Sequence, residues 1–119
     1  MRLLTSVIVL SGLFASPSGH ASQRSFQVFS TRQITPKVDR FYGQDGNAFA
    51  TVFCSAESPQ VMIVDSRLSD LDGKTFLFGS LEACEKGRSN ARDLNKKCLI
   101  ELIIDQTTQA AVLKVSRCQ

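Results

Sequence analysis

Short runs of alternating apolar and polar residues make up most of the chain after residue 22, and this period of two predicts β-strands. The clearest run is 98–104, which is apolar at every second position from Cys98 onward. The pattern predicts further strands from Ser25 to Ile34 and over residues 47–56, 60–66, 74–78 and 110–117. Turn-forming residues around Pro59 and at Asp72-Gly73 join three of these strands and predict a β-meander.

From Ser80 onward the apolar period changes to that of a helix. Small or apolar residues recur three and four positions apart, at Cys84, Gly87, Ala91 and Leu94. Ser80 is a suitable N-cap, with acidic residues near the start of the segment and basic residues near its end. Gly87 is costly in a helix interior, so its place on the stripe suggests that the helix axis lies close to the sheet there.

Residues 36–46 are predicted as a loop because turn formers outnumber periodic apolar positions. The loop contains one aromatic pair, Phe41 and Tyr42. Strands before and after a single helix favour an α+β fold. We therefore expect an antiparallel sheet of about five to six strands, covered on one face by one α-helix near residues 80–96.

Residues 1–21 have the features of a secretory signal peptide. Arg2 is followed by an apolar stretch over 3–14 and by small residues that end at Ala21. That stretch is too short to span a bilayer, so we expect no membrane span. Cleavage near Ala21 would leave residues 22–119 as a single globular domain, secreted or periplasmic, and would remove His20, the only histidine.

Four cysteines, Cys54, Cys84, Cys98 and Cys118, lie after the signal. An even number in an exported chain, with no Cys-x-x-Cys pair, favours two disulfides over a zinc site. Cys84 and Cys98 lie near opposite ends of the predicted helix, about 20 Å apart, which is too far for a bond. Cys98 and Cys118 can meet across the last hairpin. The favoured pairs are therefore Cys54–Cys84 and Cys98–Cys118.

Composition argues against catalysis and against nucleic acid. A chain without histidine lacks the imidazole of serine and cysteine hydrolases, and no phosphate-binding glycine loop is present. The whole chain has 14 Lys and Arg against 11 Asp and Glu, and loss of Arg2 leaves a net charge of only +2. We expect no enzyme, no cofactor and no nucleic-acid partner.

Two segments are candidate surface contacts: the aromatic pair Phe41-Tyr42 and the acidic positions Asp65, Asp70 and Asp72. The acidic positions do not fit a calcium-binding EF-hand loop, because a loop counted back from Gly73 begins and ends without a ligating side chain. No metal site is expected.

The resulting hypothesis is a small exported binding protein, such as an inhibitor, an immunity-type protein or an accessory subunit. It would act through its surface on a protein or glycan partner outside the cytoplasm. One alternative is a structural or assembly subunit that pairs with another chain through the edge strand from Ser25 to Ile34. Another is a small secreted effector. The sequence leaves the kingdom of origin, the strand order and the oligomeric state open.

Overall fold

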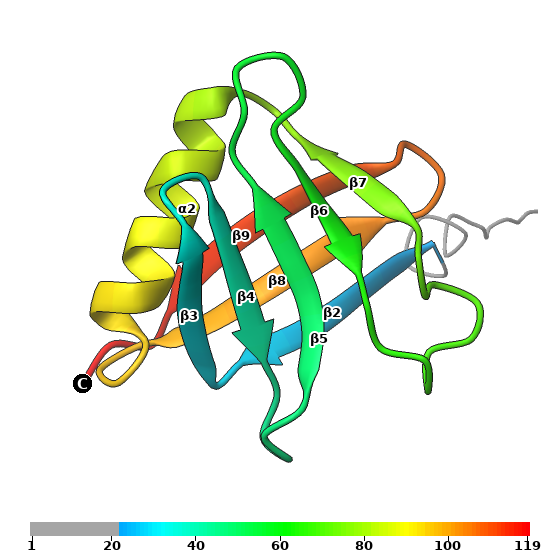
Figure 1. Ribbon diagram of the computed structural model, residues 1–119. Coiled ribbons are helices and arrows are strands. Elements are labelled where there is room, and N and C mark those ends of the chain that lie inside the picture. The colour runs from blue at the N-terminus through cyan, green and yellow to red at the C-terminus, as the bar shows by residue number, and fades with distance from the viewer. Residues whose placement is uncertain (1–21) are drawn as a thin grey trace, which may run out of the picture.

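The computed structural model describes residues 22–119, so the predicted signal peptide and His20 lie outside the described residues. The fold is α+β, with one sheet and one helix in the described part of the chain (Figure 1). The elements in chain order are β2 (Gln23–Val28), β3 (Ser30–Thr35), β4 (Val38–Tyr42), β5 (Ala48–Phe53), β6 (Gln60–Ile63), β7 (Thr75–Phe78), α2 (Leu81–Leu94), β8 (Leu99–Asp105) and β9 (Ala110–Ser116).

The sheet has eight strands in the order β2-β8-β9-β7-β6-β5-β4-β3, and it curls. Strands β2 and β3 form its two edges, yet only Phe29 separates them in sequence. The two edges are therefore halves of one bent segment, the first paired with β8 and the second with β4. This arrangement closes the sheet partway into a barrel, with the apolar core inside it (Figure 1).

The predicted meander and final hairpin are confirmed. Strand β6 pairs with β5 and with β7, and β8 pairs with β9, all antiparallel. The expected count of five to six strands and the wholly antiparallel sheet are wrong. Strands β7 and β9 are parallel, because α2 and β8 both intervene before the chain returns beside β7.

Two further differences add strands. The predicted strand from Ser25 to Ile34 is divided at Phe29, and the predicted loop over 36–46 contains β4. Alternation in β4 was hidden because one of its two inward residues is the charged Asp39, which is fully buried beside Phe41.

Helix α2 begins after Ser80, whose side chain accepts a hydrogen bond from the backbone N–H of Ala83 (3.0 Å), as predicted for an N-cap. The helix packs mainly against β9 and β3, at the side of the curled sheet, rather than over an open face (Figure 1). A Cβ on Gly87 would lie 2.7 Å from Leu113 Cδ1 on β9, so the helix does approach the sheet closely at that residue.

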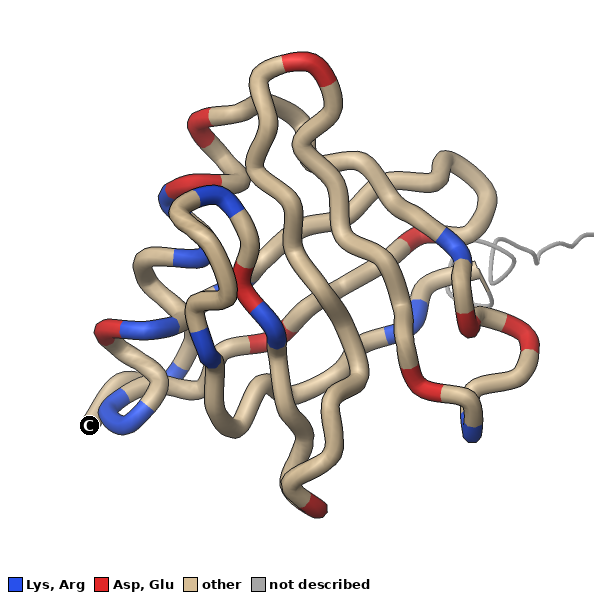
Figure 2. Tube along the Cα trace, in the orientation of Figure 1, with Lys and Arg blue, Asp and Glu red and all other residues tan. Residues whose placement is uncertain are grey.

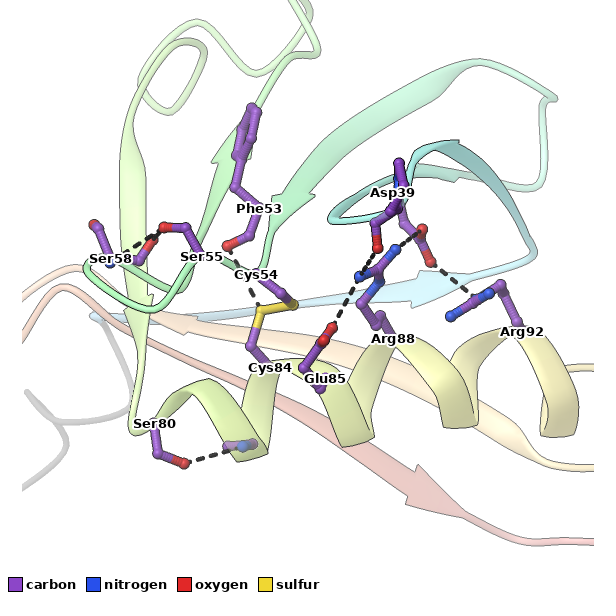
Figure 3. Close-up of a disulfide and its surroundings, with 12 residues drawn as sticks. Asp39, Phe53, Cys54, Ser55, Ser58, Ser80, Cys84, Glu85, Arg88 and Arg92 are labelled. Carbon is purple, nitrogen blue, oxygen red and sulfur yellow. Dashed lines mark hydrogen bonds and ion pairs between the residues drawn. A yellow bond between two sulfur atoms is a disulfide. The ribbon is translucent and has the colours of Figure 1, made fainter.

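Disulfides Cys54–Cys84 and Cys98–Cys118 are both present, and they are the two pairs that the sequence favoured. The first joins the end of β5 to α2 (Figure 3). One helical turn further on, Arg88 donates to Asp39 Oδ1 (2.8 Å), with both side chains almost wholly buried. Burial works against the charge of Arg88, but its hydrogen bonds to Asp39 and Glu85 outweigh burial and raise its pKa. A disulfide and a buried ion pair thus fix α2 against the barrel.

Candidate functional site

A groove lies where β2 diverges from the far end of the β4–β5 hairpin. It has a volume of about 570 Å³. Three separate parts of the chain line it: β2, the β4–β5 loop with the start of β5, and the start of the β6–β7 loop. The lining residues are Ser25, Phe26, Gln27, Gly43, Gln44, Asp45, Asn47, Phe49, Asp65, Arg67 and Leu68.

The floor of the groove is apolar, and a β-bulge helps to form it. The register of β4 against β5 shifts so that Phe41 faces Ala50 and Tyr42 faces Ala48, which leaves Phe49 as the extra residue. Phe49 is buried, with its ring 5.8 Å from that of Phe26 and 6.5 Å from that of Phe41. Phe26 is only partly buried, so it presents an aromatic surface to the groove.

One wall is an ion-pair cluster centred on Arg67. Its Nε and Nη2 donate to the two oxygens of Asp65, at 2.9 and 2.7 Å, and Nη1 donates to Asp45 Oδ2. The backbone N–H of Arg67 also donates to Asp65 Oδ1 (3.0 Å), which forms an Asx turn. A bidentate pair of this kind fixes the orientation of the guanidinium. The cluster therefore joins the β4–β5 and β6–β7 loops across the end of the groove.

The electrostatics of this wall keep both carboxyls ionised. The backbone N–H of Asn47 and then Arg67 lower the pKa of Asp45, and hydrogen bonds from Arg67 lower the pKa of Asp65. The same carboxylates raise the pKa of Arg67. All three groups are charged at neutral pH, and the wall carries one net negative charge.

The opposite side of the groove is the open edge of β2. The backbone N–H of Gln106 donates to the carbonyl of Ser22, and residues of an antiparallel strand alternate in the direction of their backbone groups. The backbone groups of Gln23, Ser25 and Gln27 must therefore point away from β8. Within residues 22–119 no other strand pairs with β2, so this edge can accept hydrogen bonds from a further chain.

A second ion pair lies beside the open edge. Arg24 donates to Asp70 Oδ2 (3.0 Å), and its guanidinium lies 5.7 Å from the centre of the Phe26 ring. The β6–β7 loop carries the acidic positions Asp65, Asp70 and Asp72, and Figure 2 shows acidic positions along this loop. Around the groove, carboxylates outnumber cations although the chain as a whole is basic.

The five surface contacts that the sequence suggested differ in exposure and in their distance from the groove. Phe41 has no exposed surface, so the prediction that it contacts a partner is wrong, and its neighbour Tyr42 is half-buried in β4 rather than in a loop. Asp65 lines the groove and Asp70 lies beside it through Arg24. Asp72 is exposed in the turn before β7 and lies outside the groove lining.

Sequence reasoning missed most of the groove. The pattern predicts strands at Phe26 and Phe49 and a loop at Asp45, assigns no element to Arg67, and gives no sign that these residues meet. The spacing Asp65-x-Arg67 was the one available signal, because an Asx turn brings these two side chains together. Nothing in the sequence shows that Asp45 joins them across 22 positions.

No protein-family model, curated protein or solved structure matches this chain. Over residues 22–119, no helix combines the length and the apolar character needed to cross a membrane. The two disulfides are typical of a protein from an oxidising environment outside the cytoplasm.

Proposed function

We propose that this protein is exported, loses its leader near Ala21, and acts without catalysis as a small binding protein whose recognition site is the groove beside β2. One observation carries the proposal: an apolar floor, a fixed charged wall and an open strand edge converge on one concave surface. Binding sites commonly combine apolar lining with a few convergent polar groups.

The surroundings of the groove favour a partner with basic groups. Asp45, Asp65 and Asp70 lie around it against two cations, Arg24 and Arg67. Charge complementarity then favours a basic segment of a protein over an acidic one, and it orients the partner during encounter. A glycan is the alternative ligand, since the aromatic face of Phe26 can pack against a sugar ring.

Site-directed photocrosslinking tests the groove directly. Gln44 is exposed and lines the groove, so a photoreactive phenylalanine analogue there leaves the core intact. Val112 is 56% exposed on β9 and outside the groove, so the same analogue there is the matched control. In cells that export the protein, we expect a covalent adduct from position 44 and none from position 112. Equal adducts at the two positions, or none at either, would refute the proposal.

Substitution of the floor gives an independent measurement. Leu68 is partly buried and lines the groove, so Leu68→Glu should abolish the adduct at position 44, whereas Val112→Glu should preserve it. Circular dichroism and free-thiol counting establish that each variant is folded with both disulfides. A folded Leu68→Glu variant that still forms the adduct would place recognition elsewhere.

The second candidate, an assembly subunit that pairs through an edge strand, is favoured by the outward backbone groups of β2. The N–H of Ser25 points to the open edge, so Ser25→Pro removes a donor for the partner without breaking the ladder to β8. Ser25→Ala is the matched control, because it loses the same hydroxyl contact with Glu101 but keeps the N–H. Loss of assembly in the proline variant alone would establish edge pairing, and equal assembly in both variants would exclude it.

Deletion of residues 22–35 does not separate these two functions. The deleted segment contains Val28, which is fully buried in the core. It also contains β2 and β3, the two edge strands of the sheet. Such a variant should unfold, so point substitutions at the edge are the informative ones.

A further inference from the structure

Two arginines lie directly opposite each other on the outer surface of the sheet. The register of β3 against β4 pairs Arg32 with Arg40. The flanking pairs, Thr31 with Phe41 and Gln33 with Asp39, point inward, since Phe41 and Asp39 are fully buried. Side chains alternate along a strand, so both guanidiniums are on the outside.

This pair has no acidic partner within residues 22–119. Four other arginines, Arg24, Arg67, Arg88 and Arg92, each form an ion pair with a carboxylate, whereas neither Arg32 nor Arg40 forms an ion pair or a side-chain hydrogen bond.

The nearest carboxylate in sequence does not relieve the repulsion. Asp39, next to Arg40, points inward to Arg88 and Arg92 (Figure 3). Like charges directly opposite each other in an antiparallel pair, with Cβ atoms about 5 Å apart, destabilise the sheet. The fold therefore carries an unfavourable arrangement that an anion would reverse.

Hydroxyl groups lie next to the arginines on the same outer surface. Two residues along the strands, Ser30 is opposite Tyr42, on the same side of the sheet as the arginines. Ser30 is exposed and Tyr42 is half-buried, so both hydroxyls can reach a ligand above the sheet. Two planar guanidinium forks with adjacent hydroxyl donors match the geometry and charge of a tetrahedral oxyanion.

We propose that the outer surface of β3 and β4 is an oxyanion site, with Arg32 and Arg40 binding one phosphate or sulfate group of a larger ligand. The site is on the sheet surface opposite to the core and is distinct from the groove beside β2. The groove favours a basic partner and this surface an anionic one, so the two sites would take different ligands.

Thermal unfolding of the disulfide-bonded chain of residues 22–119 tests the site with inorganic phosphate and with sulfate as probes. Sodium chloride keeps the ionic strength constant across each series. We expect the melting temperature to rise with phosphate or sulfate, because a ligand that binds only the folded state stabilises it. No rise in either series would overturn the proposal.

Variants give effects of opposite sign on stability and on binding. Arg32 is exposed, so Arg32→Gln should fold, and without anion it should melt at a higher temperature than the wild type because the repulsion is gone. Its affinity for phosphate should fall at least tenfold. Arg117→Gln is the matched control, since Arg117 is also exposed and forms no ion pair within residues 22–119 but follows β9, which pairs with neither β3 nor β4, and it should keep the wild-type response. An unchanged affinity in Arg32→Gln would overturn the proposal.

The source of the oxyanion follows from two further probes. Vesicles with an anionic phospholipid, against neutral vesicles, report a lipid phosphate, and a sulfated oligosaccharide reports a glycan. Binding to either probe that requires Arg32 supports the site and identifies the source. If Arg32→Gln binds either probe with the same affinity as the wild type, the oxyanion site is refuted.

Discussion

Replacement of Gly87 by alanine sets helix propensity against packing, and the structure determines which effect is larger. In an unhindered helix interior, glycine to alanine gains about 1 kcal/mol. Here the new Cβ would meet Leu113 at three atoms: Cδ1 at 2.7 Å, Cβ at 3.0 Å and Cγ at 3.4 Å. The Cδ1 contact can be relieved by a rotation of the Leu113 side chain, but the Cβ of Leu113 moves only with the backbone of β9.

Overpacking of this kind costs about 1–3 kcal/mol. After the gain in propensity, Gly87→Ala should therefore lower the free energy of unfolding by roughly 1 kcal/mol. Urea unfolding followed by circular dichroism measures the change. At the neighbouring exposed position, the difference between Lys86→Ala and Lys86→Gly measures propensity alone and serves as the control.

A double-mutant cycle identifies the clash as the cause. Leu113→Ala removes Cγ and Cδ1 and leaves only the 3.0 Å contact between the two Cβ atoms. In that background Gly87→Ala should cost less than in the wild type but should not become free of cost, because the contact between the two Cβ atoms remains, and the coupling should be at least about 0.5 kcal/mol. If Gly87→Ala instead stabilises the wild-type protein by the full propensity difference, α2 does not lie as close to β9 as the structure places it.

Three further outcomes follow from the contacts described above. Arg88→Met leaves Asp39 as a buried charge with one fewer partner and should destabilise the fold by about 3–5 kcal/mol, measured by urea unfolding; a loss below 1 kcal/mol would mean that the pair is hydrated. Replacement of both Cys54 and Cys84 by serine opens a loop of 30 positions and should cost about 3–4 kcal/mol in the same assay, and an unchanged midpoint would contradict it. Arg67→Gln should raise the pKa values of its two carboxyl partners toward the ordinary 3.8, seen by carbon NMR titration. Because those pKa values are lowered in the folded state, the stability that they contribute is present above pH 4 or so and is lost as the pH falls through them, so the variant and the wild type should converge in acid. A constant difference between them down to pH 2 would refute this.

The sequence predicted those elements whose partners are near in the chain. The helix was identified by its stripe and by Ser80, and the hairpin of β8 and β9 by strict alternation. The close approach at Gly87 could also be predicted, because glycine is unfavourable inside a helix unless a neighbouring element lies too close for a larger residue. In each case the signal and its structural cause lie close in the chain, the most distant being Gly87 and Leu113.

The groove and the curl of the sheet could not be predicted in that way. The groove combines side chains from β2, the β4–β5 loop and the β6–β7 loop, which only the bend at Phe29 brings together. Strand β4 was missed because Asp39 is buried where the pattern requires an apolar residue, and its partner Arg88 lies 49 positions away. A charged residue on an inward position can be interpreted only when the opposite charge is known to face it.

The bent segment of β2 and β3 has a consequence for the export that we propose. Its first half pairs with β8, so that Gln23 is opposite Asp105, about 80 positions further along. A polypeptide that leaves the cell with its amino end first must wait until almost all of it has crossed before this strand meets its partner. Such distant pairing is slow to form. Throughout translocation the emerging β2 has both edges free, and in that interval a chaperone of the envelope would have access to it.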